Sequence, residues 1–269
     1  AIDAIFKNNH FTHIIHLGAQ AGVRYSVQNP RAYIESNLVG FFNVLDAARL
    51  AKVRHFVFAS TSSVYGSNTQ MPFSTGDNTD HPVSLYAATK KSNEAMAHSY
   101  AFTHRLPVTG LRFFTVYGPW GRPDMAYFLF TDAMAKGKSL TLFDQGLLRR
   151  DFTYIDDIAE GIVRVADHPP EPNSSYDSNH PDPATSSAPY RVLNIGNHEP
   201  VPVKELVALI ENALGKKANI VHAPMQKGDV KATFADVEPL ARLTGFRPQT
   251  PLAVGIRNFV SWYKDFYKI

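Results

Sequence analysis

A tyrosine and a lysine stand four residues apart, at Tyr86 and Lys90, in a stretch whose pattern predicts a helix over residues 84–104. Side chains at this spacing lie on the same face of a helix, one turn from each other. A lysine ammonium in that position lowers the pKa of a tyrosine phenol, so the pair could accept and return a proton. The spacing also arises by chance, and a surface tyrosine beside a solvated lysine would explain it equally well.

A run of hydroxyl side chains favours the catalytic interpretation. The apolar segment that begins at His55 ends in four consecutive hydroxyl residues, Ser60 to Ser63. Taken alone, this run could mark only the polar exit of a strand. A hydroxyl at a strand end, beside a tyrosine and a lysine of the next helix, nevertheless forms a set that orients a substrate oxygen and moves its proton. We therefore interpret the two features together as a proton-transfer site.

The elements that must position these residues alternate as βαβ units do. Apolar runs of strand length cover residues 12–17, 55–60 and 108–114, and amphipathic stretches at 31–52 and 84–104 separate them. This alternation predicts an α/β fold with a Rossmann-like, doubly wound parallel sheet. The later elements are less regular. They are strands at 140–143 and 191–195, and helices at 156–166, from about Pro202, and at 251–267.

This pattern divides the chain into a main domain, residues 1–118, and a smaller α/β lobe, residues 119–269. Residues 140–166 and 190–196 are candidates to return to the main domain. The intervening stretch 168–189 is rich in proline and short polar residues, which predicts a surface loop. Asp156 and Asp157 open a predicted helix, so we interpret them as capping residues rather than as a paired-carboxylate site.

Composition excludes several classes of function. The net charge of +3 in 269 residues is spread along the sequence, which disfavours a dedicated nucleic-acid or membrane-surface role. The absence of cysteine excludes a thiolate nucleophile and a disulfide, and it fits a reducing compartment such as the cytoplasm. The eleven histidines show no metal-ligand spacing, so we expect no metal. The sequence contains no apolar run long enough for a membrane span and opens with no signal-peptide pattern.

The first predicted strand lacks a feature that dinucleotide-binding sheets usually carry. A glycine-rich turn after that strand normally offers its backbone N–H groups to a pyrophosphate. Gly18 and Gly22 follow the strand with a different spacing, which suits an ordinary turn. Residues 1–8 resemble the end of a helix, and we expect the sequence to begin inside its first domain.

Five segments resemble the extended short-chain dehydrogenase/reductase family of NAD-dependent nucleotide-sugar epimerases. They are HLGAQAGVRYSVQNPRAYIESNLVG from His16, FASTSSVYG from Phe58, SLYAATK from Ser84, LRFFTVYGPWGRPDMA from Leu111 and RRDFTYIDDIA from Arg149. The resemblance implies that Tyr86 is the catalytic base, that Lys90 holds the nicotinamide ribose, and that Thr61 completes the triad. The segments TSSVYG and TVYGPWGRPDMA are most similar to the UDP-glucuronate 4-epimerase branch.

The resemblance also implies binding residues. Those for NAD in the main domain, besides Tyr86 and Lys90, are Leu17, Gly18, Ala19, Gln20, Asn37, Ser60 and Phe113. Those for the UDP-sugar are Arg24, Thr61, Ser62, Ser63, Thr115, Arg122, Leu140, Thr141, Phe143, Arg150 and Asp229. Within this set, the hydroxyls and Arg122 would bind the sugar carboxylate, residues 140–143 the uracil, Arg150 a phosphate and Asp229 the ribose.

The expected reaction is epimerisation at C4 of UDP-glucuronate through a 4-keto sugar, which makes the protein an isomerase. Ser62 and Ser63 stand where related decarboxylases and dehydratases place an acidic residue. Two alternatives stay open: an epimerase for UDP-glucose or a UDP-N-acetylhexosamine, and a non-catalytic protein that binds sugar nucleotides. The resemblance further implies a homodimer through the helices at 31–52 and 84–104, packed as a four-helix bundle.

Overall fold

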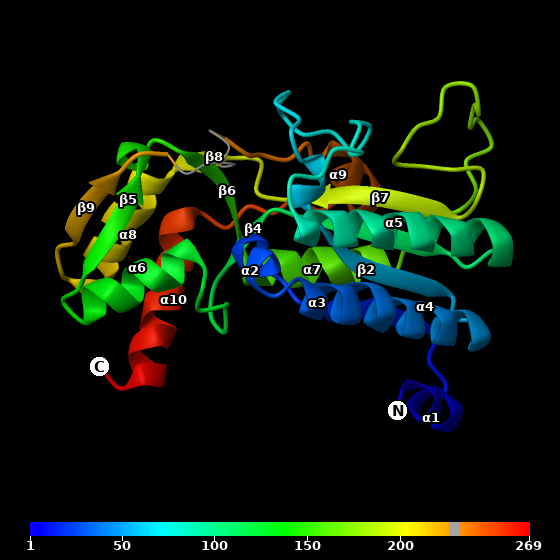
Figure 1. The fold of residues 1–269 in the computed structure, drawn as a ribbon, viewed down its shortest axis with the longest axis horizontal. Coiled ribbons are helices and arrows are strands. Elements are labelled where there is room, and N and C mark those ends of the chain that lie inside the picture. The colour runs from blue at the N-terminus through cyan, green and yellow to red at the C-terminus, as the bar shows by residue number, and fades with distance from the viewer. Residues whose placement is uncertain (226–231) are drawn as a thin grey trace. The chain divides into compact units, whose positions relative to one another are not determined.

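The computed structural model describes residues 1–225 and 232–269, and the chain divides into two compact units. Of the two segments considered for a return to the main domain, residues 161–166 and 190–195 lie in the first unit, and residues 140–160 lie in the second. The first unit comprises Ala1–Phe113, Gly161–Ile195 and Asp236–Phe246, and the second comprises Phe114–Glu160, Gly196–Ala235 and Arg247–Ile269 (Figure 1).

A parallel sheet forms the centre of the first unit. Its order is β1 (His13–His16), β2 (His55–Thr61), β3 (Val108–Phe113) and β7 (Tyr190–Ile195), and all three pairings are parallel. The register aligns Thr61 with Phe113, so these strands end at one edge of the sheet. The α/β prediction is therefore confirmed, and the strand ends differ from the predicted bounds by at most a residue at each side.

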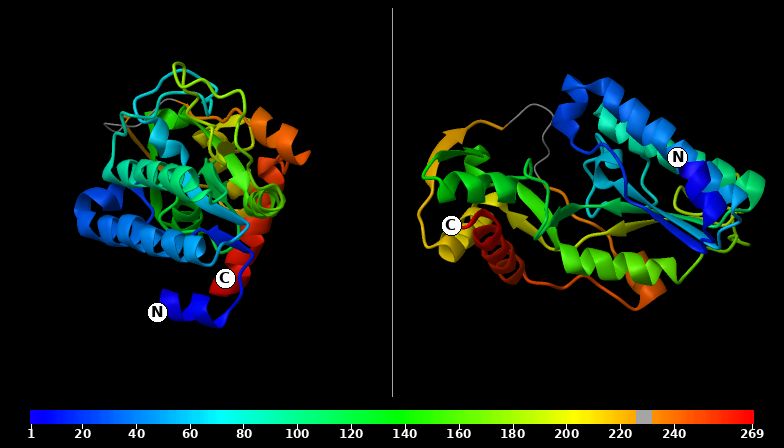
Figure 2. Two further views of the ribbon diagram at one scale, coloured as in Figure 1. Left: turned by 90° about the vertical axis from the view of Figure 1, so that its right-hand side faces the viewer. Right: turned by 90° about the horizontal axis from the view of Figure 1, so that it is seen from below.

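Helices cover both faces of this sheet, because a parallel sheet is apolar on each side. Helices α4 (Phe41–Leu50) and α5 (Leu85–His104) lie side by side on one face, where Phe56 and Phe58 of β2 are buried against them (Figures 1 and 2). His55, which points to the other face, is hydrogen-bonded to the end of α7 (Ile155–Ala166). Smaller helices complete the unit: α1 (Ile2–Asn8), α2 (Val23–Gln28), α3 (Pro30–Tyr33) and α9 (Glu238–Thr244).

The long helix predicted over residues 31–52 is present, with a π-helical turn (Ile34–Gly40) in its middle. At that turn the side-chain amide of Asn93 on α5 donates to the backbone oxygen of Asn37 at 2.6 Å. A side chain that donates a hydrogen bond to a backbone oxygen of a helix accounts for a local change in the helical hydrogen-bond pattern. The turn therefore places Asn37 against α5, near Tyr86 and Lys90.

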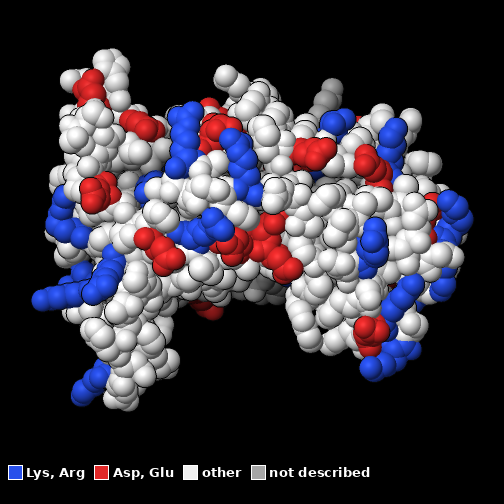
Figure 3. All heavy atoms as spheres, turned by 180° about the vertical axis from the view of Figure 1, so that it is seen from behind, with Lys and Arg blue, Asp and Glu red and all other residues white. Residues whose placement is uncertain are grey.

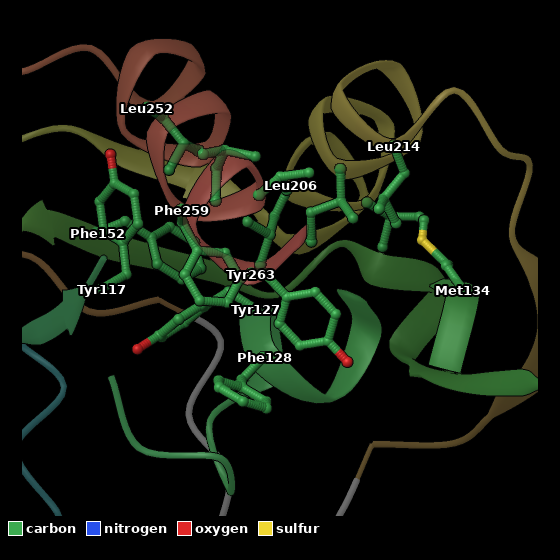
Figure 4. Close-up of a cluster of buried hydrophobic side chains, with 14 of the residues drawn as sticks. Tyr117, Tyr127, Phe128, Met134, Phe152, Leu206, Leu214, Leu252, Phe259 and Tyr263 are labelled. Atoms are coloured by element: carbon green, nitrogen blue, oxygen red, sulfur yellow. The ribbon is translucent and has the colours of Figure 1, made fainter. Parts of the chain in front are cut away.

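The second unit has its own core of aromatic and aliphatic side chains. Tyr127 and Phe128 of α6 (Ala126–Ala135) pack against Phe259 and Tyr263 of α10 (Leu252–Tyr267), and Leu206 of α8 (Val203–Leu214) joins them (Figure 4). The strands form two small sheets, β4 (Thr115–Tyr117) with β6 (Arg149–Tyr154) and β8 (Pro200–Pro202), and β5 (Ser139–Phe143) with β9 (Asn219–Ala223). A short 3₁₀ turn, η3 (Asp144–Gly146), follows β5.

The surface agrees with the even spread of charge along the sequence. Acidic and basic side chains are interspersed over the face that Figure 3 shows. The predicted surface loop at 168–189 is confirmed, since it contains neither helix nor strand, apart from one isolated bridge from Thr185 to Arg191 of β7. No helix in the described part of the chain combines the length and the apolar character that crossing a bilayer requires.

Candidate active site

Tyr86 and Lys90 lie on successive turns at the start of α5. The helix begins after Ser84, whose hydroxyl accepts a hydrogen bond from the backbone N–H of Ala87 at 3.1 Å. This cap fixes the first turn, in which Tyr86 is half-buried and its ring meets the ring of Tyr33 edge-on at 6.1 Å. The structure thus places the predicted base and lysine on one rigid helix.

Thr61 ends β2 and caps the 3₁₀ turn η2 (Ser62–Tyr65) that follows it. Its hydroxyl accepts from the backbone N–H of Ser63 at 3.2 Å and donates to the Ser63 hydroxyl at 3.3 Å. Helix α5 packs against both β2 and this turn. The structure therefore packs the helix that carries Tyr86 and Lys90 against the strand and the turn that carry the hydroxyl run. These lie at the carboxyl edge of the parallel sheet, where ligands of doubly wound folds bind.

Lys90 is almost completely buried, with 3% of its surface exposed. Burial lowers the pKa of its ammonium to about 8, although the negative charge of Glu94 opposes this effect. Burial, together with the positive charge of Lys90, lowers the pKa of His16 to about 4. At neutral pH this site therefore holds a charged lysine beside an uncharged histidine.

A buried ion pair lies one turn beyond Lys90. Arg112 of β3, which is 0% exposed, donates two hydrogen bonds of 2.9 Å to the carboxylate of Glu94 on α5. The Ser60 hydroxyl donates to the same carboxylate at 2.6 Å. Burial alone would raise the pKa of Glu94, but the charge and hydrogen bonds of Arg112 hold it below its ordinary value. This network ties the helix that carries Tyr86 and Lys90 to the ends of β2 and β3.

The network extends to the turn that follows Thr61. The guanidinium of Arg112 lies over the ring of Tyr65, 4.9 Å from its centre, and the Tyr65 hydroxyl donates to Asn194 of β7 at 2.6 Å. The Asn194 amide in turn donates to the backbone oxygens of Phe73 and Asp236, at 2.7 and 3.2 Å. Three strands, the η2 turn and α5 are thus held by one set of buried polar contacts.

The residues predicted for NAD fall into two groups. Leu17, Gly18 and Ala19 follow β1 and are exposed, and Phe113 is half-buried at the end of β3. Ser60 and Asn37 are buried, and their polar atoms are used within the protein. The Asn37 side chain accepts from the backbone N–H of Gln20 at 2.7 Å and donates to the backbone oxygen of Gln20 and the hydroxyl of Thr89, both at 3.0 Å. In this structure Asn37 and Ser60 therefore support the loop and the strand end.

The predicted sugar-nucleotide residues are shared between the units. Arg24 is exposed on α2, and Ser62 and Ser63 are half-buried in η2, all in the first unit. The second unit holds Thr115 at the start of β4 and Arg150 on β6, both half-buried, and the segment Leu140, Thr141 and Phe143 on β5. Arg122 is exposed, and Asp124 accepts two hydrogen bonds from it, at 3.0 and 2.7 Å. Asp229 lies outside the described residues.

Asp156 and Asp157 both lie in the first turn of α7, which agrees with their predicted place at its start, and Asp157 makes a further contact. Its carboxylate accepts hydrogen bonds from the backbone N–H groups of Gln249 and Thr250, at 3.1 and 2.8 Å. These donors lie just before α10, so Asp157 ties down the entry to another helix. The sequence could not indicate this, since the partners are more than ninety residues away.

Sequence reasoning also missed Glu94, Arg112, His16 and the buried Asp151 of β6. The available signal was a charged residue inside an apolar run, because a buried charge requires a partner. Arg112 stands between Leu111 and Phe113, and Glu94 lies four residues after Lys90. Among the described residues, no group of three or more His, Asp or Glu side chains is arranged to hold a metal ion.

Comparisons with known proteins show which family the chain is similar to. The profile of the family described as NAD dependent epimerase/dehydratase matches residues 1–179. Protein CapI of Staphylococcus aureus is 53% identical over 255 residues, which are 95% of this chain and 76% of that protein. A protein of Rhizobium meliloti (strain 1021) named probable UDP-glucuronate 4-epimerase is 49% identical over 256 residues, which are 95% of this chain and 75% of that protein.

A solved structure is similar over nearly the same length. The UDP-glucuronic acid 4-epimerase from Bacillus cereus, in complex with UDP-glucuronic acid and NAD, superposes with a TM-score of 0.82 at 30% identity. The match covers 99% of this chain and 79% of that one.

Proposed function

Since this chain belongs to the NAD-dependent epimerase/dehydratase family, we propose that it is an isomerase that interconverts UDP-glucuronate and UDP-galacturonate. One observation carries the proposal: Tyr86 and Lys90 occupy successive turns of α5, which packs against the strand end that carries Thr61. The names of the Rhizobium and Bacillus relatives support UDP-glucuronate as the substrate. Membership of the family confirms the predicted dependence on NAD.

The residues at the sheet edge fit a nicotinamide cofactor. Lys90 is a buried cation, and a ribose hydroxyl pair would give its ammonium the hydrogen-bond acceptors that burial withholds. The exposed residues 17–19 follow β1 at the edge where dinucleotides bind in this fold. NAD held by Lys90 and residues 17–19 would supply the acceptor and donor of the hydride at C4 of the sugar.

The chain's own residues manage the proton and the orientation of the sugar. Tyr86 accepts the proton of the C4 hydroxyl as the hydride leaves and donates it back when the keto group is reduced. The Thr61 hydroxyl, fixed by its contacts with Ser63, orients the same sugar oxygen. The Lys90 ammonium favours the phenolate form of the base through its positive charge. The product differs from the substrate only at C4, so the cycle has no net redox change.

The carboxylate of the substrate needs several donors. A 4-keto uronic acid is a β-keto acid. It can lose carbon dioxide unless the site holds its carboxylate in an orientation that disfavours cleavage of the bond to that carboxylate. Ser62, Ser63 and Thr115 offer hydroxyls, and Arg122 offers a guanidinium whose orientation Asp124 supports. On the nucleotide side we assign a phosphate to Arg150, the uracil to residues 140–143 of β5, and the ribose to Asp229. Among the described strands, β5 pairs only with β9, which leaves its other edge for a base.

Substrate assays with one variant test this proposal. We expect turnover of UDP-glucuronate, followed by chromatographic separation of the C4 epimers, to exceed turnover of UDP-glucose and UDP-N-acetylglucosamine. Tyr86→Phe should abolish turnover and leave substrate binding nearly intact. Tyr100→Phe is the matched control, because Tyr100 lies on the same helix and its hydroxyl donates to Asp46, at 3.1 Å. An active Tyr86→Phe protein would refute the assignment, and preference for UDP-glucose would change the substrate.

We also propose a homodimer through the helices of residues 30–50 and 85–104. Apolar side chains on these helices are exposed, among them Val39 at 53%, Phe42 at 45% and Phe102 at 60%. Single exposed apolar residues are common, but several on adjacent helices suit a helix-packed interface. Sedimentation that shows only monomer at micromolar concentration would remove this proposal. The cytoplasmic location is likewise a proposal, supported by the absence of cysteine.

A further inference from the structure

Asp151 of β6 is fully buried, at 0% exposure, in the second unit. Its carboxylate accepts three backbone hydrogen bonds: from Asn197 at 2.7 Å, from His198 at 3.1 Å and from Ala235 at 3.2 Å. These donors belong to two segments far apart in the sequence, one after β7 and one before α9. Asp151 is thus the point at which three pieces of backbone meet.

Only an acidic side chain satisfies these donors. An ionised carboxylate has two oxygens that only accept, whereas an asparagine amide has one oxygen and an NH₂ group that must donate. Burial raises the pKa of Asp151 above its ordinary value, although the three N–H groups oppose this effect. Folding must remove this carboxylate from water, which costs free energy. A contact kept in spite of that cost indicates that the geometry of the joined segments matters.

Further contacts hold the same place. A Cβ added at Gly196 would lie 2.7 Å from an Asp151 oxygen and 2.9 Å from the Ala235 Cβ, so this approach requires glycine. The His198 ring donates from Nδ1 to the backbone oxygen of Ala235 at 2.8 Å. The backbone N–H of Thr233 donates to the oxygen of Arg149, two residues before Asp151, at 3.2 Å. The start of β6 is therefore hydrogen-bonded to the segment around Ala235, and the Asp151 carboxylate binds the backbone of that segment and of residues 197–198.

Arg150 lies directly before Asp151 on this strand. Successive side chains of a strand point to opposite faces, so fixing the Asp151 carboxylate inward fixes the direction in which Arg150 leaves the backbone. The antiparallel pairing of Arg150 with Val201 and of Asp151 with Pro200 sets the same register from the β8 side. A guanidinium that binds a diphosphate gains affinity when its direction is set in advance.

We propose that Asp151 is a positioning residue for the nucleotide part of the substrate, which it serves by locking residues 197–198 and 235 onto β6 and so orienting Arg150. This inference rests on the proposed function, in which Arg150 contacts a phosphate of a UDP-sugar. Asp151 touches neither the substrate nor the reacting atoms. Its replacement should consequently weaken the binding of any uridine diphosphate more than it slows the chemical step.

The variant Asp151→Asn tests the inference in the NAD-containing protein, with UDP as the probe. We expect the Kd for UDP, measured by titration calorimetry, and the KM for the UDP-sugar to rise at least about tenfold. The value of kcat at saturating substrate should change by less than about threefold, and the NAD content should stay at the wild-type level. Asp157→Asn is the matched control, since Asp157 is another carboxylate of the second unit that accepts backbone N–H bonds.

Two results would overturn the role of Asp151: unchanged UDP affinity in a folded Asp151→Asn protein, or an equal loss of affinity in Asp157→Asn. If Asp151→Asn does not fold, Gly196→Ala decides, because its Cβ would lie 2.7 Å from an Asp151 oxygen and so displace the carboxylate from its backbone donors. Weaker UDP binding in that variant supports the inference, and unchanged binding refutes it. Failure of the wild-type protein to bind UDP would instead refute the proposed function.

Discussion

Replacing Glu94 by glutamine should destabilise the first unit strongly. The substitution keeps the size of the side chain but removes the only charge that Arg112 contacts through its two 2.9 Å hydrogen bonds. Arg112 is 0% exposed, so water cannot take the place of the lost carboxylate. Breaking a buried ion pair by removing one partner costs about 3–5 kcal/mol. A domain of comparable size shifts by about 2–4 °C per kcal/mol, which predicts a Tm lower by about 6–20 °C.

Calorimetry on Glu94→Gln and two companion variants checks this reasoning. Lys91 lies 3.8 Å from Glu94 but is partly exposed, so Lys91→Gln should cost less than about 1 kcal/mol. In the double variant Glu94→Gln with Arg112→Met, no buried charge is left unpaired, and we expect about half or more of the lost stability to return. A Glu94→Gln protein that melts within 2 °C of the wild type, about the shift from 1 kcal/mol or less, would refute the claim that this pair supports the site.

Two further predictions concern pH. His55 donates from Nδ1 to the backbone oxygen of Ala166 and accepts from Thr109, and burial lowers its pKa from 6.5 to about 4. Its contribution is complete above pH 6.5 and is lost as the pH falls towards 4, by about 3 kcal/mol, so urea unfolding should show a flatter acid slope for His55→Gln. The pKa of Lys90 is lowered to about 8, so kcat should decline above that pH as the ammonium loses its proton. In Lys90→Arg the charge persists, and an alkaline limb that stays near pH 8 would contradict the assignment to Lys90.

The elements of the first unit were predictable because each has a strong local pattern. Strand β2 contains the apolar run FVFA, residues 56–59, and α5 has both its helical spacing and the Ser84 cap in the sequence. The second unit was harder to predict. Strands β4 and β8 have three residues each, which is too short for a periodic signal, and β6 begins with charged residues. These strands exist because they pair with each other, and such pairing is not visible along a single segment.

The candidate site shows the same division. Tyr86 and Lys90 could be recognised because their relation is local, one turn of a single helix. Asn37 and Ser60 were predicted beside the cofactor, yet their side chains serve Gln20 and Glu94 in this structure. Whether a polar side chain faces a ligand or a neighbour depends on elements that approach from elsewhere in the chain. A motif therefore places a residue at the site without fixing which way its polar atoms point.

Buried charges offer a way to recover part of what the motifs miss. Arg112 and Asp151 each stand in a strand directly before an aromatic residue, at positions where an unpartnered charge would be very costly. Their partners are distant in sequence, 18 residues away for Glu94 and 84 for Ala235. The sequence thus indicates that a partner must exist but not which residue supplies it. The pair of Arg112 and Glu94 holds the helix that carries Lys90, and Asp151 orients Arg150. A charged residue inside a strand, next to a binding motif, therefore indicates how the binding residues are held in place.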